Sequence, residues 1–591
     1  MKRLLSLALI LTLLATFAVG CSPKADTDTS SAVSAGEGTV SSVDDGEESS
    51  TVTDTASVDD GNNNGDANID TNSKGNASKP NSAASVANVN KTGFPIVNKK
   101  ITLDVMILKP ATHSDYSSMT FTKKYEEMTN IKINWQVVAE ADMYSKKTLT
   151  LASRDYPDLI LLANSVTSAD VVKYGTAGVL QSIGDQIKTY APNLQKVIDS
   201  NKEVKRALTA PDGKIYSIPN VTTRNTADLF ASKVYVNADW LKALNLKKPT
   251  NYTELLTVLR AFKNNDPNKN GKKDEIPLVI DMFNPGVTAC PQGLHWTWED
   301  DCMGIDKSGK ISFTFGSEQF LESLRFLRTL ADESLMDERV FKGDLSMQAV
   351  TNTANDNVGM FIMQHGTTGL PESKLEKYEV CQPIQGNTGT AVTQTKLKGQ
   401  IEPFWGVVPV SNQNVEATLR WLDYFYTVDG FIFKEYGPSG SNVLKKMPTG
   451  KYQVVSRNVS DKYKVAPGWV LPGLNSAEAN AMFMEKATTT VLDTWYQKVD
   501  VKQCIPMYEK YIPEKYIPTL YFSLAEANKM QSLRDGLIGY AKTTSMNFIY
   551  RSGELNLDTG WNTYIAELKK LGMDEMVGYY QKAYNNYTKN S

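Results

Sequence analysis

The segment from residue 100 to residue 164 alternates between strand-forming and helix-forming patterns, and this alternation limits the possible folds more than any other feature of the chain. Three runs read as strands and two intervening runs read as helices: strands 100–108, 131–138 and 156–164, and helices 121–130 and 143–155. Strict alternation predicts an α/β fold with a parallel sheet and right-handed crossovers. Ligands of such sheets bind beyond the carboxyl ends of the strands, which makes Asn164 and Ser165 candidate ligand-binding residues.

The amino terminus has the pattern of a secretory signal peptide. Two basic residues precede a mostly apolar run from Leu4 to Val19, which is followed by glycine and Cys21. Small residues followed by a cysteine resemble the bacterial lipobox, in which signal peptidase cuts before the cysteine and the cysteine is acylated. The pattern therefore predicts removal of residues 1–20 and a lipid on Cys21, although Ala18 stands where a lipobox usually has leucine. An ordinary secreted protein without this lipid is the alternative.

The segment after the signal peptide has an unusual composition. Residues 22–93 contain no Phe, Trp, Tyr, Leu or Met, and they carry twelve acidic side chains against four lysines. Such a segment cannot bury enough apolar surface to offset the entropy lost on ordering, so residues 21–93 are predicted to be a disordered linker that starts at the lipidated cysteine. A flexible chain of about seventy residues has a reach on the order of 45 Å. The folded part is expected to start near Phe94.

The remaining chain, Phe94 to Ser591, is too long for one hydrophobic core and predicts at least two lobes. The net charge of the whole chain is −3, to which the linker contributes −8 and the signal peptide +2, so about +3 remains on the folded part. So small a charge on so long a chain disfavours nucleic acid or an anionic surface as a partner. After the signal peptide, no apolar run approaches the length of a membrane span.

Six motifs stand in order along the folded part: YEEMTNIKINWQVV, LASRDYPDLILL, YGTAGVLQSIGDQIKTYAPN, DGKIYSIPN, VYVNADWLKALNLKKPTNYTELLTVLRAFKNNDPNKNGKKDEIPL and WNTYIAELKKLGMDEMVGYYQKAYNNY. Together they resemble the extracellular solute-binding lipoproteins of family 1, which capture sugars and oligosaccharides for bacterial ABC importers. The similarity covers nearly all of residues 95–591. It implies a two-lobe fold of the class II periplasmic-binding-protein type, with a ligand cleft between the lobes and a hinge that the chain crosses more than once.

The resemblance also implies how the chain divides between the lobes. Lobe 1 is expected to comprise residues 94–220 and 359–430, and lobe 2 residues 221–358 and 431–591, with the C-terminal helices shared. The motif NDNVGMFIMQHG resembles the return strand of the family, and ATLRWLDYFYTVDGF resembles the helix that follows it.

A turn-rich stretch, DPNKNGKKDEIP at residues 266–277, has the spacing of an EF-hand-like loop, in which oxygen ligands alternate and a glycine permits the sharp turn. Pro277 stands where an EF-hand has its bidentate glutamate, so the ordinary pattern fails. Similar loops of the resembled family close with an acid beside the ninth-position aspartate, which is Glu275 here. The expected ligands of a structural Ca²⁺ are Asp266, Asn268, Asn270, Asp274 and Glu275, with the backbone carbonyl of Lys272. The alternative is a polar turn between a helix and a strand.

Sugar recognition requires aromatic faces for the C–H faces of the rings and planar polar groups for the hydroxyls. Trp296 and Trp298 follow the strand IPLVID, where sugar-binding relatives place stacking aromatics, and their i, i+2 spacing directs both to one side of an extended segment. The other candidates stand near expected hinge crossings: Trp405, His365, Asn220 and Arg224. For each of these residues, burial in the core is the alternative. Trp240 and Trp561 are assigned to helix packing.

The sequence contains no recognisable set of catalytic residues. The three histidines, His113, His295 and His365, lie in unrelated stretches, and the chain contains no HExxH, GxSxG or Walker motif. The cysteine spacing matches no zinc pattern, and Cys290 and Cys302 could either pair or remain thiols.

The sequence thus predicts a non-enzymatic, surface-tethered, monomeric substrate-binding component of an ABC importer. It would capture a carbohydrate, with an oligosaccharide as the expected ligand, between two lobes and deliver it to the permease subunits. It would be held by its N-terminal lipid at the outer face of the cell membrane. The alternative function is a cell-surface glycoside-active enzyme.

Overall fold

The computed structural model describes residues 86–223, 230, 233–280, 295–296, 301–346, 349–351, 356–364, 366, 370–387, 391, 400–455, 459–476, 478, 482, 495–550 and 556–589. The predicted signal peptide, Cys21 and the predicted linker as far as residue 85 lie outside these residues. None of the described helices is long and apolar enough to cross a membrane.

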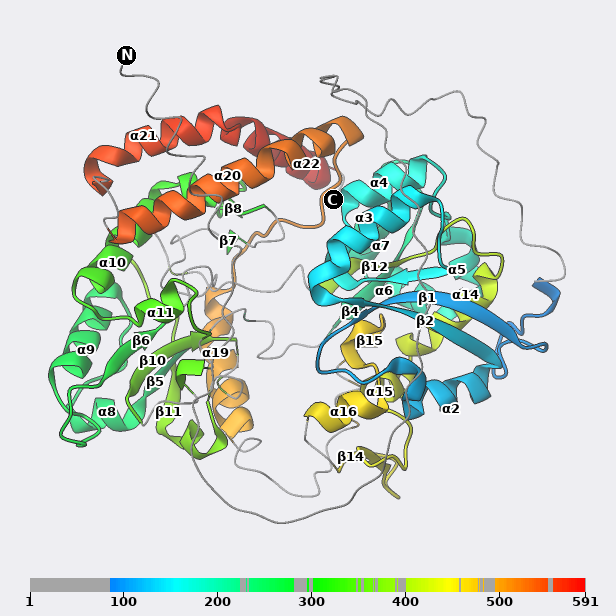
Figure 1. The fold of residues 1–591 in the computed structure, drawn as a ribbon, viewed down its shortest axis with the longest axis horizontal. Helices are drawn as coiled ribbons and strands as arrows, with labels where there is room; N and C mark the ends of the chain where they lie inside the picture. Colours follow the sequence, from blue (N-terminus) through cyan, green and yellow to red (C-terminus); the bar gives the residue numbers. More distant parts are fainter. Residues whose placement is uncertain are drawn as a thin grey trace, which may run out of the picture. The chain divides into compact units, whose positions relative to one another are not determined.

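The first lobe, here called lobe 1, is built on a six-stranded sheet with the order β15-β4-β12-β3-β1-β2 (Figure 1). Its strands are β1 (Ile101–Lys109), β2 (Ile131–Ala139), β3 (Leu159–Leu161), β4 (Ser217–Thr222), β12 (Ile401–Val407) and β15 (Leu474–Asn475). Its helices are α2 (Thr120–Thr129), α3 (Met143–Ser153), α4 (Ser168–Thr176), α5 (Gly184–Tyr190), α6 (Pro192–Ser200), α7 (Lys202–Leu208), α14 (Val415–Asp423), α15 (Val428–Tyr436) and α16 (Val459–Val465). A hairpin, β13 (Leu444–Lys446) and β14 (Tyr452–Val454), packs against α15.

Both faces of the lobe 1 sheet are covered, as a parallel sheet requires. Side chains of β1 alternate between two cores: Leu103, Val105 and Ile107 enter one, and Met106 and Leu108 enter the other. β2 and β3 lie on either side of β1 and run parallel to it. The parallel sheet predicted from the alternation of strands and helices is therefore confirmed.

The second lobe, lobe 2, is built on a four-stranded sheet with the order β11-β5-β10-β6 (Figure 1). Its strands are β5 (Lys233–Asn237), β6 (Ile276–Val279), β10 (Val358–Met363) and β11 (Tyr378–Cys381), and a smaller sheet holds β7 (His295–Trp296), β8 (Met303–Ile305) and β9 (Ile311–Phe313). Its helices are α8 (Ala238–Ala243), α9 (Tyr252–Asn264), α10 (Glu318–Asp332), α11 (Glu338–Phe341), α19 (Cys504–Tyr508), α20 (Leu524–Tyr550), α21 (Leu557–Lys570) and α22 (Met573–Lys589).

The strand β10 shows that the predicted lobe boundaries are wrong in two places. β10 pairs with β5 and β6, so the segment expected to return to lobe 1 at residue 359 stays in lobe 2, and the return comes only at β12. Residues 431–475, expected in lobe 2, complete lobe 1, since β15 pairs with β4. The apolar run of β10 reads as a buried strand in either sheet, and its pairing depends on residues far away in the chain. The chain still passes between the two sheets more than once, as predicted.

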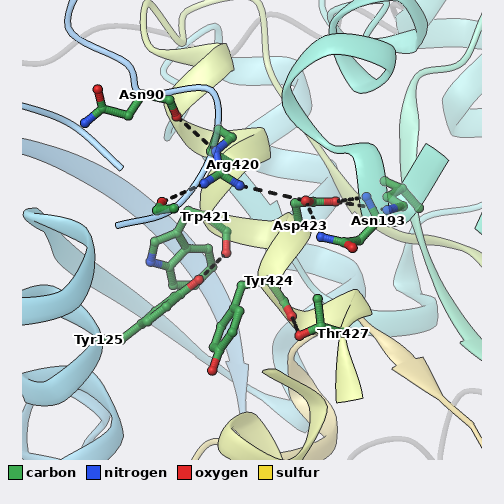
Figure 2. A network of polar contacts seen from close by, with 10 residues as sticks. Asn90, Tyr125, Asn193, Arg420, Trp421, Asp423, Tyr424 and Thr427 are labelled. Atoms are coloured by element: carbon green, nitrogen blue, oxygen red, sulfur yellow. Dashed lines mark hydrogen bonds and ion pairs between the residues drawn. The ribbon is translucent and has the colours of Figure 1, made fainter. Parts of the chain in front are cut away.

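Lobe 1 begins before the predicted start at Phe94. Asn90 N–H donates to the carbonyl of Ile96 at 2.8 Å, and Asn98 N–H donates to the carbonyl of Asn88 at 3.0 Å, which closes a hairpin over residues 88–98. The guanidinium of Arg420, on α14, donates from Nε to the Asn90 carbonyl at 3.1 Å and from Nη2 to the Gly93 carbonyl at 2.8 Å (Figure 2). The N-terminal hairpin is therefore part of lobe 1.

Asp423, one turn after Arg420, ties α14 to α6. The residue before α6, Ala191, provides no side-chain cap. The buried carboxylate of Asp423 accepts from the backbone N–H groups of Asn193 and Leu194, both at 2.9 Å, and from the Asn193 amide at 2.8 Å (Figure 2). The first N–H groups of a helix have no partner within the helix, so Asp423 acts as an N-cap from a distant part of the chain.

Candidate functional site

The carboxyl ends of the parallel strands of lobe 1 define the edge where a ligand of this sheet would bind. β1, β2, β3 and β4 run in the same direction, and β12 runs antiparallel to β3 and β4. The carboxyl end of β4 therefore meets the amino end of β12. We call this the lobe 1 ligand edge, and it contains Asn220 and Glu402.

Asn220 and Glu402 form a polar pair at the lobe 1 ligand edge. They face each other in the register of β4 and β12, and Asn220 Nδ2 donates to Glu402 Oε2 at 2.7 Å. Both residues are half-buried. An amide and a carboxylate fixed in this way can hydrogen-bond the hydroxyl groups of a ligand. The sequence analysis predicted Asn220 but missed Glu402, whose importance depends on the strand pairing.

Two tryptophans lie close together, and one of them, Trp405, is on β12 with Glu402. Trp405, predicted as a ligand residue, is only 4% exposed, and its indole N–H donates to the Val470 carbonyl at 2.9 Å. Trp469, which the sequence analysis missed, is 37% exposed and meets Trp405 edge to face, with ring centroids 6.3 Å apart. Trp405 thus lies behind the surface and supports Trp469. Nothing in the local sequence shows which of the two is exposed.

A group of buried charges lies behind the edge. Glu435 on α15 binds the ammonium groups of Lys434 at 2.8 Å and Lys462 at 3.0 Å. Burial alone would raise the pKa of the Glu435 carboxyl, but the two ammonium groups outweigh burial and lower this pKa to about 2. Burial lowers the pKa of Lys434, and the negative charges of Glu435 and Glu402 act against that shift. This group joins α15 to α16, and Glu402 of the polar pair is near enough to influence the pKa of Lys434.

The other predicted residues of lobe 1 lie at the carboxyl end of β3 or beyond β4. Ser165 lies in the short turn after β3, as predicted, but it is fully buried, and its hydroxyl has no hydrogen-bond partner among the described residues. Asn164 lies in the same turn, and its side chain is outside the described part of the chain, as is the whole of Arg224.

In lobe 2, the carboxyl ends of β6 and β10 lie at one edge of the sheet, since the two strands are parallel. β6 leads toward the segment with Trp296 and Trp298, and β10 leads toward His365. The backbone of Trp296 is extended, as the sequence predicted, and it pairs with Gly304 of β8. Trp298, His365 and the side chain of Trp296 lie outside the described residues.

The predicted cation loop joins α9 to β6, at the edge of the lobe 2 sheet opposite these segments. The Asp266 carboxylate accepts from the backbone N–H groups of Asn270 at 3.0 Å and Gly271 at 2.8 Å. Asn270 Oδ1 accepts from Lys272 N–H at 2.7 Å, and Asn270 Nδ2 donates to Asp274 Oδ1 at 3.0 Å. These hydrogen bonds hold the loop in a tight turn in which its side-chain oxygen atoms accept from its own N–H groups.

Glu275 gives a physical reason to expect a cation at this loop. Both of its carboxylate oxygens are buried, and neither has a hydrogen-bond partner among the described residues. Burial raises the pKa of this carboxyl, and the charges of Asp274 and Asp266 raise it further. Carboxylate and amide oxygens suit Ca²⁺. The described residues contain no group of three or more His, Cys, Asp or Glu side chains arranged to hold a metal, so binding would require these acids to turn toward one another.

Comparison with known proteins identifies the family. Residues 109–430, more than half of the chain, match the family described as bacterial extracellular solute-binding protein. The chain belongs to this family. A solute-binding protein holds its ligand without transforming it, so the alternative of a glycoside-active enzyme is dropped.

Two curated relatives extend the comparison of this solute-binding protein. The fructooligosaccharide ABC transporter substrate-binding protein FusA of Streptococcus pneumoniae serotype 4 is 27% identical over 518 residues, which cover 84% of this chain and 92% of FusA. Lipoprotein LipO of Bacillus subtilis is 28% identical over 365 residues, which cover 58% of this chain and 68% of LipO.

Solved structures confirm the two-lobe α/β fold of the periplasmic-binding-protein type. The structure of S. pneumoniae FusA in complex with kestose matches with a TM-score of 0.68 and 23% identity, and covers 83% of this chain and all of FusA. The alginate-binding protein AlgQ2 without calcium ion matches with a TM-score of 0.64 and 21% identity, and covers 83% of this chain and 99% of AlgQ2.

Proposed function

We propose that this solute-binding protein is the substrate-binding component of an ABC importer, and that it captures an oligosaccharide and delivers it to the permease. The observation that carries the proposal is the polar pair Asn220–Glu402 at the lobe 1 ligand edge. Glu402 is on the same strand as Trp405, whose ring meets that of the exposed Trp469. Such a combination of planar polar groups and an aromatic face suits a sugar. The relative FusA, whose name assigns it to fructooligosaccharides, supports the same class of ligand.

The ligand would lie between the ligand edge of lobe 1 and the segments beyond β6 and β10 of lobe 2. On this proposal Asn220, Asn164 and Arg224 contribute from lobe 1, and Trp296, Trp298 and His365 from lobe 2. Trp405 and Ser165 are buried, so they would act by supporting their exposed neighbours.

A binding screen tests the proposal. Calorimetry with a panel of neutral and acidic oligosaccharides should give saturable binding of at least one glycan without release of any cleavage product. Binding of peptides or other nutrients, with no binding of any glycan, would contradict the proposed substrate class while keeping the transport function. Loss of glycan uptake on deletion of the gene, with rescue by the intact protein, would support delivery to a permease.

We infer that the loop 266–277 binds a structural Ca²⁺ through Asp266, Asn268, Asn270, Asp274, Glu275 and the Lys272 carbonyl. The buried Glu275 carboxylate, which has no hydrogen-bond partner among the described residues, supports this inference. So do two related structures, one described as a FusA EF-hand mutant and one as AlgQ2 without calcium ion. A bound cation would neutralise the acidic side chains and hold the loop between α9 and β6. Its place at the amino end of β6 favours a structural role over ligand contact.

We also propose that Cys21 carries a lipid that tethers the protein to the outer face of the cell membrane. The lipobox-like sequence supports this proposal, and so does the relative named lipoprotein LipO. Replacing Cys21 with alanine should move the protein from the membrane fraction to the medium. Retention of the Cys21→Ala variant in the membrane fraction would contradict lipid anchoring.

A further inference from the structure

We propose that Asn357, which stands just before β10 and outside the loop 266–277, completes the proposed cation site: it holds Glu275 in place, and its side-chain oxygen Oδ1 binds the cation. This inference rests on the proposed cation site and deepens it, because it adds a ligand from a distant part of the chain. Three features of lobe 2 carry it: two hydrogen bonds that flank Glu275, a buried amide oxygen that accepts no hydrogen bond among the described residues, and a contact of the same segment with Asn268.

Asn357 holds the backbone on both sides of Glu275. β6 and β10 lie side by side and run parallel, with Ile276 opposite Val358 (Figure 1). Asn357 Nδ2 donates to the Asp274 carbonyl at 2.8 Å, and the Ile276 N–H donates to the Asn357 carbonyl at 2.7 Å. These groups belong to the two peptide bonds that Glu275 forms with its neighbours, so the position of Glu275 depends on Asn357.

The side-chain oxygen of Asn357 is an acceptor without a donor. The hydrogen bond to the Asp274 carbonyl assigns the orientation of the amide, since the reverse orientation would bring two acceptors together. Oδ1 is buried and has no hydrogen-bond partner among the described residues, and the same holds for both carboxylate oxygens of Glu275. Buried acceptors without donors destabilise a fold. A cation bound between these two neighbouring side chains would satisfy all of these oxygens at once.

The segment that contains Asn357 also contacts the first half of the loop. Asn268, one of the expected ligands, donates from Nδ2 to the Asp356 carbonyl over 3.4 Å. The Asp356 carboxylate binds the Lys377 ammonium at 2.6 Å, which fixes the segment to the turn before β11. Asn357 is therefore held against the loop by contacts that do not involve the cation. A ligand held in place before binding loses little conformational freedom when the ion arrives.

An additional amide oxygen suits Ca²⁺ better than Mg²⁺. Ca²⁺ takes about six to eight oxygen ligands in a flexible geometry, whereas Mg²⁺ requires a near-ideal octahedron and usually keeps several water molecules. The expected loop ligands already include three carboxylates, and Asn357 adds an oxygen without adding negative charge. A cation bound in this way would join the loop to β10 as well as to α9 and β6.

The test uses the whole mature chain, made as the Cys21→Ala form so that it stays in solution, and freed of metal with a chelator. Tb³⁺ takes the place of Ca²⁺, and its luminescence lifetimes in ordinary and heavy water give the number of water molecules bound to the ion. We expect about one more bound water in Asn357→Ala than in the protein with Asn357, because water occupies the position of a lost oxygen ligand. Calorimetry should show that Asn357→Ala weakens Ca²⁺ binding by about tenfold or more.

Two further variants separate a ligand from a residue that only stabilises the fold. Asn357→Asp keeps an oxygen atom at this position and should keep the original number of bound water molecules, and it remains informative if Asn357→Ala does not fold. Asn251→Ala is the matched control, because Asn251 caps the opposite end of α9, where its side chain accepts from the Glu254 N–H at 3.0 Å. It should lower the melting temperature but leave the Ca²⁺ affinity and the number of bound water molecules unchanged.

Two outcomes would overturn the role of Asn357 alone: an equal number of bound water molecules with and without the Asn357→Ala substitution, or an additional bound water in Asn357→Asp. Failure of both Ca²⁺ and Tb³⁺ to bind the protein with Asn357 would instead remove the proposed cation site, and the role of Asn357 with it.

Discussion

At the scale of single residues, Glu435 shows how lobe 1 tolerates charges in its interior. Its carboxylate binds two ammonium groups. Lys434 is only 1% exposed, so water can barely reach its charge, and Lys462 lies 3.0 Å from the carboxylate. Breaking a buried pair by removing one partner is costly, because the remaining charge is left without compensation. Glu435 should therefore matter more for stability than any ion pair at the surface.

Replacing Glu435 with glutamine should lower the free energy of unfolding by about 3 kcal/mol at pH 7, since the buried Lys434 and the partly exposed Lys462 lose their counter-charge. The folded-state pKa is about 2, below the ordinary value of 4.5. The carboxylate thus stabilises the wild type fully above about pH 4.5, and this contribution is lost as the pH falls toward 2. Urea denaturation from pH 7 to pH 3 should show this acid-dependent loss in the wild type and a smaller one in Glu435→Gln.

Glu127→Gln removes a surface ion pair with Lys124 and serves as the control, with an expected change below about 0.5 kcal/mol. Equal stability of Glu435→Gln and Glu127→Gln at pH 7 would show that the buried group is not held together by its charges.

At the scale of secondary-structure elements, local patterns suffice where an element is defined by its own residues. The predicted strand 131–138 and helix 121–130 correspond closely to β2 and α2, because the periodicity of apolar side chains is a local property. The pairing of strands in a sheet is not a local property. The predicted lobes of β10 and β15 were wrong because the sequence of a strand does not identify the strand beside which it pairs. The same limit explains Trp405 and Trp469, whose exposure depends on the turn between α16 and β15.

The N-terminal hairpin is attached to lobe 1 by the buried side chains of Ile96 and Val97 and by hydrogen bonds, two of which come from the side chain of Arg420 on α14. Arg420→Met keeps most of the side-chain volume but removes both hydrogen bonds to the hairpin carbonyls, and should cost about 3 kcal/mol. Hydrogen exchange at the Asn90 and Asn98 amides, which close the hairpin, should become faster. Arg325→Met, which removes an exposed ion pair with Asp558, should change neither property. Unchanged hydrogen exchange at Asn90 in Arg420→Met would mean that the hairpin is stable without the two Arg420 hydrogen bonds.

The cation loop allows a test that separates a metal site from a polar turn. Chelation should lower the melting temperature of the wild type, because a ligand that binds only the folded state stabilises it by mass action. Asp266→Ala combined with Asp274→Ala removes two of the three carboxylates and should abolish the response to chelator. Lys272→Ala is the matched control, since Lys272 would contribute only its backbone carbonyl and the response should persist. Identical melting of the wild type before and after verified removal of metal would leave the loop as a polar turn.

At the scale of the whole molecule, each sheet has the residues proposed to hold the ligand at one edge and a different feature at the opposite edge. In lobe 1 the polar pair lies at the carboxyl end of β4, whereas the N-terminal hairpin joins the amino end of β1. In lobe 2 the segments with Trp296 and His365 follow the carboxyl ends of β6 and β10, and the cation loop precedes β6. The proposed lipid attachment and the proposed cation site would thus lie away from the residues proposed to hold the ligand, and changes at either should affect stability more than affinity.

Two truncations test this separation together with the start of the folded part. Deletion of residues 22–85 removes only chain that precedes the described residues and should change neither the melting temperature nor glycan affinity. Deletion of residues 22–93 also removes Asn88 and Asn90, and with them the hydrogen bonds to Ile96, Asn98 and Lys99 that close the hairpin. It should lower the melting temperature by a few degrees and leave the affinity within about twofold. Equal melting temperatures of the two truncated proteins would place the start of the stable fold at Phe94, where composition alone predicts it. A loss of affinity in the longer truncation would show that the hairpin and the ligand edge are coupled through the lobe 1 sheet.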